Sequence, residues 1–342
     1  MGSSPTEFPG QPEPPVRLTT SAEAAAVKKA DTTSTDTPFP PQPLVVPVPA
    51  KRERRWPYVL LFVLTFASTT LVGEMHYLSF YLGFGGGSNP FPWWESLILG
   101  LWYSVPVLAI LGCHEMGHYL ACRYYRIAAS RPYFLPMPII PTGTLGAFIR
   151  IRQPIPGKRE LFDIGIAGPI AGFLVAVPLL FIGMYLSRID QIPSGEGDLI
   201  WLGEPLLFKL ATWLTFGTVA DGSTVTMHPV AFASWFGLLA TAINLFPIGQ
   251  LDGGHISYAV LGRKSSAVTL LMVACLVGLA IFSWSSWAVW AGVTIAMLFA
   301  FGPHHPRTPD EYAPLDPARK ALAVFAVIMF ILCFTPVVVQ RL

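Results

Sequence analysis

Seven long apolar runs occupy most of the sequence after residue 55 and constrain the fold more than any other feature. A helix needs about 20 apolar residues to cross the hydrocarbon core of a bilayer. Charged residues make up only 12% of the chain, against about 25% in a soluble domain. The sequence therefore predicts an all-α polytopic membrane protein with six or seven transmembrane helices. The apolar runs cover residues 56–72, 97–121, 161–186, 230–248, 267–282, 287–301 and 321–339.

Basic residues cluster in the segments that fall on one side of the membrane if the predicted spans alternate in direction. The loops on the opposite side are poor in Lys and Arg. By the positive-inside rule, this asymmetry places the N-terminus in the cytoplasm, and we expect a bacterial inner membrane. The clustered residues are Lys51, Arg52, Arg54, Arg55, Arg123, Arg126, Arg131, Arg150, Arg152, Lys158, Arg159, Arg263, Lys264, Arg307, Arg319 and Lys320.

The first 50 residues differ from the rest of the chain in composition. They are rich in Pro, Ser and Thr and show little apolar periodicity. Such a segment buries too little apolar surface to offset the entropy of ordering it. We predict that residues 1–50 form a disordered cytoplasmic tail and that residues 56–342 form the transmembrane domain. The net charge of +2 says little by itself; the partners that we expect are the lipid bilayer and a membrane-protein substrate, and no nucleic acid.

The motif HEMGH lies near the end of the second apolar run. Residues four apart share one face of a helix, so the imidazoles of His114 and His118 can bind one metal ion. Glu115 between them can serve as a general base. Ionisable groups inside an apolar helix are costly unless they have a function. The pattern therefore predicts a metal site rather than a chance match.

A third ligand is needed, because catalytic zinc sites usually have three protein ligands. The candidate is Asp252, in the segment NLFPIGQLDGGH that begins at Asn244 and ends the fourth apolar run. Its prolines and glycines would interrupt a helix. His114 lies about 25 Å along the second run at helical rise. The second and fourth runs cross the membrane in the same direction, and Asp252 reaches a similar depth at the end of the fourth. The three residues can therefore share one site near the cytoplasmic leaflet.

Together these motifs resemble the site-2 protease family of intramembrane zinc metalloproteases. Both family signatures, HExxH and NxxPxxxLDG, are present in full. The resemblance implies one zinc ion per chain, with His114, His118 and Asp252 as ligands. It further implies that Glu115 is the general base and that Asn244 contacts the substrate or stabilises the transition state.

The resemblance covers about residues 95–260 and implies a metalloendopeptidase of regulated intramembrane proteolysis. Its substrate would be a transmembrane helix of another protein. The loops are too short for the PDZ or CBS modules of some branches, so the chain is closest to short bacterial and plant chloroplast members. The resemblance leaves homo-oligomerisation open.

A glycine-rich segment between the second and third runs resembles the family's membrane-embedded strand. It includes Gly143, Thr144, Leu145 and Gly146. A free strand edge beside the metal would hold an unwound substrate through its backbone. Irregular backbone at membrane depth must be buried or line a wet cavity. The alternative for this segment is a plain cytoplasmic hairpin.

Other interpretations remain open at this point. One is a membrane protease of the CAAX-processing type, although a Glu usually replaces Asp252 there. Others are a zinc transporter or sensor without hydrolytic activity, and a pseudoenzyme.

Gly168 and Gly172 form a small-residue face that favours close helix packing. His304 and His305 are either a second metal site or, as we expect, part of a solvated loop.

Overall fold

The computed structural model describes residues 54–139, 141–192, 200–283, 285–302, 305–336 and 339–341. The predicted N-terminal tail, residues 1–50, and His304 lie outside the described residues.

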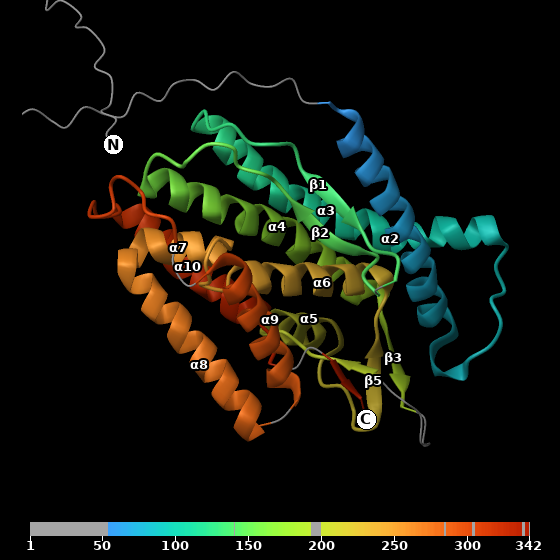
Figure 1. Ribbon diagram of the computed structural model, residues 1–342. Helices are drawn as coiled ribbons and strands as arrows, with labels where there is room; N and C mark the ends of the chain where they lie inside the picture. The colour runs from blue at the N-terminus through green and yellow to red at the C-terminus, as the bar shows by residue number, and fades with distance from the viewer. Residues whose placement is uncertain are drawn as a thin grey trace, which may run out of the picture. The chain divides into compact units, whose positions relative to one another are not determined.

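Most of the described chain is helical (Figure 1). Four helical stretches are long and apolar enough to cross a membrane, which is consistent with the predicted polytopic membrane protein. They are α2 (Trp56–Leu82) with its short extension, α3 (Trp93–Tyr124), α4 (Lys158–Leu186), and the continuous stretch from α7 (Asp252–Leu261) into α8 (Ser265–Ser283).

The remaining helices are shorter. They are α5 (Leu206–Phe216), α6 (Pro229–Asn244), α9 (Ser285–Phe301) and α10 (Pro317–Cys333). The sequence defines the start of α10 clearly, because the Asp316 side chain accepts a hydrogen bond from the Arg319 N–H and Pro317 occupies the first turn. The 3₁₀ turn η1 (Gly83–Gly85) extends α2. A second 3₁₀ turn, η2 (Gly262–Lys264), joins α7 to α8.

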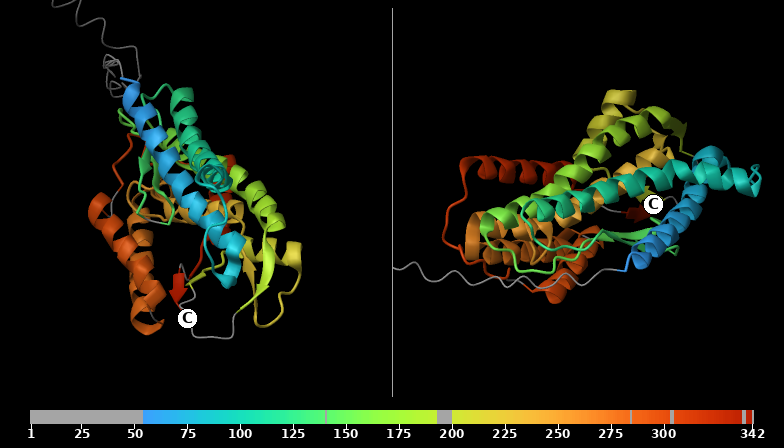
Figure 2. Two further views of the ribbon diagram at one scale, coloured as in Figure 1. Left: turned by 90° about the vertical axis from the view of Figure 1, so that its right-hand side faces the viewer. Right: turned by 90° about the horizontal axis from the view of Figure 1, so that it is seen from above.

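Helices α3, α4 and α6 lie side by side and form the centre of the helical unit (Figure 1). The interfaces are tight because small residues meet at them. A Cβ added at Gly183 of α4 would lie 2.3 Å from the backbone nitrogen of Ala231 of α6. Leu180 and Leu238 are fully buried between the same helices. Helix α6 is therefore held inside the unit, while α8 stands at its periphery in Figure 1 and in the left view of Figure 2.

Strands β1 (Tyr133–Pro136) and β2 (Thr144–Phe148) form an antiparallel pair between α3 and α4 in sequence. Tyr133 pairs with Phe148, and the pairing continues beyond the strands, where Ser130 N–H donates to the Arg150 carbonyl. Two other strand pairs are present, β3 (Arg188–Gln191) with β5 (Ser223–Thr226), and β4 (Ile200–Leu202) with β6 (Val339–Arg341).

The segment between α9 and α10 is attached firmly to the beginning of α4. The Asp310 carboxylate accepts the backbone N–H of Lys158, at 2.8 Å to Oδ1. The Lys158 ammonium in turn donates to the carbonyls of Glu311 and Ala313. Arg319 at the start of α10 forms an ion pair with Asp163 of α4. These contacts hold residues 305–316 over the end of the unit where α4 begins.

Candidate metal centre

Helix α3 carries His114, Glu115 and His118 on its buried side. Their exposed fractions are 5%, 7% and 7%. One nitrogen or oxygen from each residue lies within 4.8 Å of the others. The i, i+4 spacing places the two imidazoles together, as the HEMGH pattern predicts. A cavity of about 210 Å³ opens beside the three residues.

A backbone carbonyl orients the imidazole of His118. Its Nδ1–H donates to the carbonyl of Ile164 on α4 at 2.7 Å. This bond places the proton on Nδ1 and leaves the lone pair on Nε2, which faces His114. Metal-binding histidines are commonly oriented by such a partner, because it fixes both the tautomer and the ring plane.

Asp252 reaches the same place from a different element. The sequence predicted that the segment from Asn244 to His255 ends the fourth apolar run with a broken helix, and α6 does end at Asn244, while Asp252 begins the next helix, α7. Pro247 and Gly249, which has φ +48°, lie in the break between the helices. Because the chain turns there, the Asp252 carboxylate points back toward α3.

The three predicted ligands, together called the donor triangle below, lie close to one another, and each histidine faces a different oxygen of the Asp252 carboxylate. His114 Nε2 lies 3.2 Å from His118 Nε2 and 3.2 Å from Asp252 Oδ2. His118 Nε2 lies 3.3 Å from Asp252 Oδ1. In a tetrahedral site with bonds of about 2.0–2.1 Å, neighbouring ligand atoms lie roughly 3.3–3.4 Å apart. The spacing of the two imidazole nitrogens and the carboxylate is therefore compatible with the protein ligands of a tetrahedral zinc site.

Two further predicted residues adjoin this triangle. The side-chain nitrogen of Asn244, the last residue of α6, lies 3.2 Å from His114 Nε2. The Glu115 carboxyl faces the backbone N–H of Ile149, just after β2. Both residues also line the cavity. The structure thus brings together the five residues of the two sequence motifs for which a role was predicted.

The glycines of α4 have a role that the sequence analysis did not identify. A Cβ at Gly168 would lie 2.1 Å from His118 Nε2, and one at Gly172 would lie 3.1 Å from the His114 Cβ. The space that these glycines leave is filled by the two imidazoles. Their spacing of four matches that of the histidines, because the two helices pack with these positions opposite each other.

The predicted strand segment lies partly beside the cavity. Gly143 is buried against α2, where its carbonyl accepts the Ser68 hydroxyl at 2.6 Å. The Thr144 hydroxyl donates to the Leu135 carbonyl of β1 and accepts the N–H of Gly146. The residues of this segment that line the cavity come slightly later in sequence, at Ala147, Phe148, Ile149 and Ile151.

One edge of β2 carries no strand among the residues that the structure describes. On the other edge, toward the chain that leads into β1, the carbonyl of Arg150 accepts a backbone hydrogen bond and the N–H of Arg152 donates one. Because backbone groups alternate along a strand, Ala147 and Ile149, which follow the register shift opposite Leu135 and Pro136, point their N–H and carbonyl groups to the opposite edge. Ile149 follows this alternation, since its N–H faces Glu115. The open edge of β2 therefore faces the candidate metal centre.

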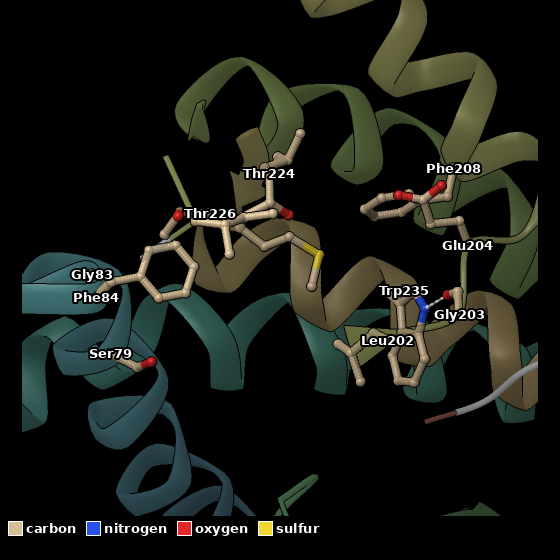
Figure 3. A pocket seen from close by; sticks show the side chains of 13 residues that line it. Ser79, Gly83, Phe84, Leu202, Gly203, Glu204, Phe208, Thr224, Thr226 and Trp235 are labelled. Carbon is tan, nitrogen blue, oxygen red and sulfur yellow. Dashed lines mark hydrogen bonds between the residues drawn. The ribbon is translucent and has the colours of Figure 1, made fainter. Parts of the chain in front are cut away.

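A second cavity, of about 260 Å³, lies nearer the beginning of α6 (Figure 3). Trp235 borders it and donates from Nε1 to the Gly203 carbonyl at 2.7 Å. The carboxylate of Glu204 lies at its wall, and none of its described lining residues is His or Cys. This cavity lacks the donor set of a zinc site and is separate from the metal centre at the end of α6.

Comparison with known sequences agrees with the site. The profile of Peptidase family M50 matches residues 102–284, just over half of the chain. This chain belongs to peptidase family M50. The match includes every residue of the donor triangle and confirms the resemblance to site-2 proteases on which the sequence analysis relied.

The M50 member is also similar to curated plant proteins. It is 32% identical over 244 residues to the probable zinc metalloprotease EGY1, chloroplastic, of Arabidopsis thaliana, covering 68% of this chain and 42% of that protein. It is 33% identical over 230 residues to EGY1 of Oryza sativa subsp. japonica, covering 61% and 39%. EGY2 of Arabidopsis thaliana is 28% identical over 248 residues, covering 71% and 43%. The chain spans about two fifths of the length of these relatives.

Proposed function

We propose that this chain is an intramembrane zinc metalloprotease that hydrolyses peptide bonds in membrane-spanning segments of other proteins. The observation that carries the proposal is the triangle of His114, His118 and Asp252 donor atoms with Glu115 beside it. Membership of the M50 family and the names of the plant relatives, which are probable zinc metalloproteases, support the same activity. The proposed cofactor is one zinc ion per chain.

Each motif residue has a distinct proposed role. His114, His118 and Asp252 would hold zinc, which when bound polarises the scissile carbonyl and lowers the pKa of water at the site toward about 7. Glu115 takes the proton from the attacking water and delivers it to the leaving nitrogen. Asn244 donates from its amide to the substrate carbonyl oxygen, which gains negative charge during the attack.

The open edge of β2 is the proposed substrate-binding element. A transmembrane helix shields its own peptide bonds, so the substrate must unwind before it is cut. An unwound segment then pairs with the backbone of β2 at Leu145 and Ala147, and with that of Ile149 just after the strand. The predicted contacts at Gly143 and Thr144 would be indirect, through the positive-φ turn and the buried hydroxyl that position the strand. Association of β2 with the membrane is part of this proposal.

We further propose six or seven transmembrane helices, made of the four long candidates and two or three of the helices α6, α9 and α10. In this topology the N-terminus is cytoplasmic and the membrane is a bacterial inner membrane. His118 lies less than two turns before the end of α3, next to the basic residues Arg123 and Arg126. The positive-inside rule then places the metal centre near the cytoplasmic leaflet.

The activity is tested with purified protein in lipid vesicles and a model transmembrane substrate. The Glu115→Gln variant should retain zinc and fold but lose cleavage, because Gln cannot act as a base. Comparing membrane-anchored fragments in cells that carry the parent protein or this variant would identify natural substrates. A parent protein that transports zinc across vesicles and cleaves nothing would instead identify a transporter.

A further inference from the structure

Two histidines outside the donor triangle form a pair that the proposed mechanism does not use. His255 lies one helical turn after Asp252 on α7 and lines the same cavity. Its Nδ1 lies 2.7 Å from Nε2 of His305, which precedes α10 in the sequence by about a dozen residues. The rings meet nearly edge to face, with centroids 4.9 Å apart.

Hydrogen bonds determine the proton positions in this pair. His305 Nδ1 lies 2.6 Å from the carbonyl of Pro306, which can only accept, so Nδ1 carries a proton. In a neutral imidazole the other nitrogen then has the lone pair. His305 Nε2 must therefore accept from the Nδ1–H of His255. As a result, His255 has an unprotonated Nε2 on the ring side away from His305.

The surrounding contacts hold His305 in place and keep it neutral. Its ring stacks on Tyr258 of α7 at 4.5 Å between centroids, and the Tyr258 hydroxyl accepts the Thr308 N–H. The Lys158–Asp310 contacts attach the same segment to α4. Burial also lowers the pKa of His305, which disfavours its charged form.

The position of His255 gives its free lone pair a possible partner in the substrate. The cavity is lined both by the β2 segment, at Ala147 and at Ile149 just after the strand, and by residues 250–252 with His255. An extended peptide has backbone N–H groups on both edges. If one edge pairs with β2, the N–H groups on the other edge need acceptors, because an unpaired buried N–H is costly.

We propose that His255 Nε2 accepts a hydrogen bond from a backbone N–H of the bound substrate, on the edge away from β2, and that His305 is a positioning residue that fixes its tautomer. This proposal rests on the proposed protease function. His255 would thus contribute to substrate binding without being a zinc ligand or a base.

The test measures peptide binding in a background that cannot cleave. Glu115→Gln protein in phosphatidylcholine vesicles is titrated with a fluorescent transmembrane peptide that carries a central Gly pair. Adding His255→Leu should weaken binding about tenfold, the usual effect of losing one hydrogen bond. Adding His305→Leu should weaken binding several-fold. His305→Gln should restore most of the affinity, because the Gln oxygen can still accept from His255 Nδ1–H.

Two further readouts separate positioning from a general structural role. Nitrogen-15 NMR of histidine-labelled protein should show an unprotonated Nε2 on His255, assigned by its loss in His255→Leu, and a changed signal in His305→Leu. The His255→Leu/His305→Leu double variant should bind no more weakly than His255→Leu alone. Zinc content should remain about one per chain throughout.

Three outcomes would overturn the proposal: peptide binding unchanged in His255→Leu, additive effects in the double variant, or loss of zinc from His255→Leu, which would make His255 a ligand. Failure of the protease function is seen separately. It would appear as a parent protein that cleaves no substrate, whereas the binding and NMR measurements do not depend on cleavage.

Discussion

Substituting Gly168 by Ala adds a single methyl group at the point where α4 meets His118. The added Cβ would lie 2.1 Å from His118 Nε2 and 2.5 Å from both Cδ2 and Cε1. An ordinary contact begins at 3.4 Å, so the ring must move by about 1.3 Å if the helices stay in place. The ring cannot move freely, because its Nδ1–H is bonded to the Ile164 carbonyl.

This displacement of the His118 ring is large compared with the variation that a metal–ligand distance tolerates. Ligand distances in metal sites hold within about ±0.2 Å, so a displacement of about 1.3 Å removes His118 from the zinc. A misplacement of about 1 Å near the reacting atoms alone costs on the order of 100-fold in rate. We expect Gly168→Ala to lower cleavage by at least about 100-fold and to reduce bound zinc, at an overpacking cost of about 1–3 kcal/mol in stability.

The assay measures zinc content, cleavage and thermal unfolding on the same purified samples. Gly172→Ala is the matched control on the same helix, since its Cβ would meet His114 atoms at 3.1–3.2 Å, which requires only a few tenths of an ångström. Gly278→Ala in α8 meets nothing within 4 Å and should be neutral or stabilising by up to about 1 kcal/mol. Normal zinc and normal cleavage in Gly168→Ala would refute the reasoning.

Three other perturbations test separate parts of the structure. Asp252→Ala should lose zinc as measured by metal analysis, whereas full zinc in that variant would remove Asp252 from the donor set. Ala147→Pro deletes an N–H at the open edge of β2, so cleavage should fall sharply while zinc is retained. The control Leu145→Ala should have little effect on cleavage. Unchanged turnover in Ala147→Pro would rule out backbone pairing. Arg319→Ala breaks the partly buried ion pair with Asp163 and should lower the free energy of unfolding by about 1 kcal/mol in thermal scans, and an unchanged midpoint would show that the pair does not tie α10 to α4.

Some disagreements between sequence and structure arise where an element ends. The first apolar run was predicted to stop at residue 72, but α2 continues to Leu82. Glu74 and His76 interrupt the apolar pattern without ending the helix. His76 is retained there because its Nε2 bonds the Pro141 carbonyl at 2.7 Å and its ring packs on Tyr103. These partners come from distant parts of the chain, so the hydropathy pattern cannot indicate them.

The sequence by itself determined the membrane-protein class and the two motifs of the site. Apolar run length reports on a bilayer directly, and the i, i+4 spacing of His114 and His118 is a local property of a helix. These features depend only on neighbouring residues, and no tertiary contact is needed to recognise them.

Only the tertiary structure decided how the separate elements meet at one point. Asp252 completes the donor triangle because the chain breaks after Asn244 and reverses toward α3. Gly168 leaves space for His118 because α3 and α4 pack in one particular register. His255 and His305 meet across 50 residues of sequence. Such contacts depend on the packing of whole helices, which many residues determine together and no single motif encodes.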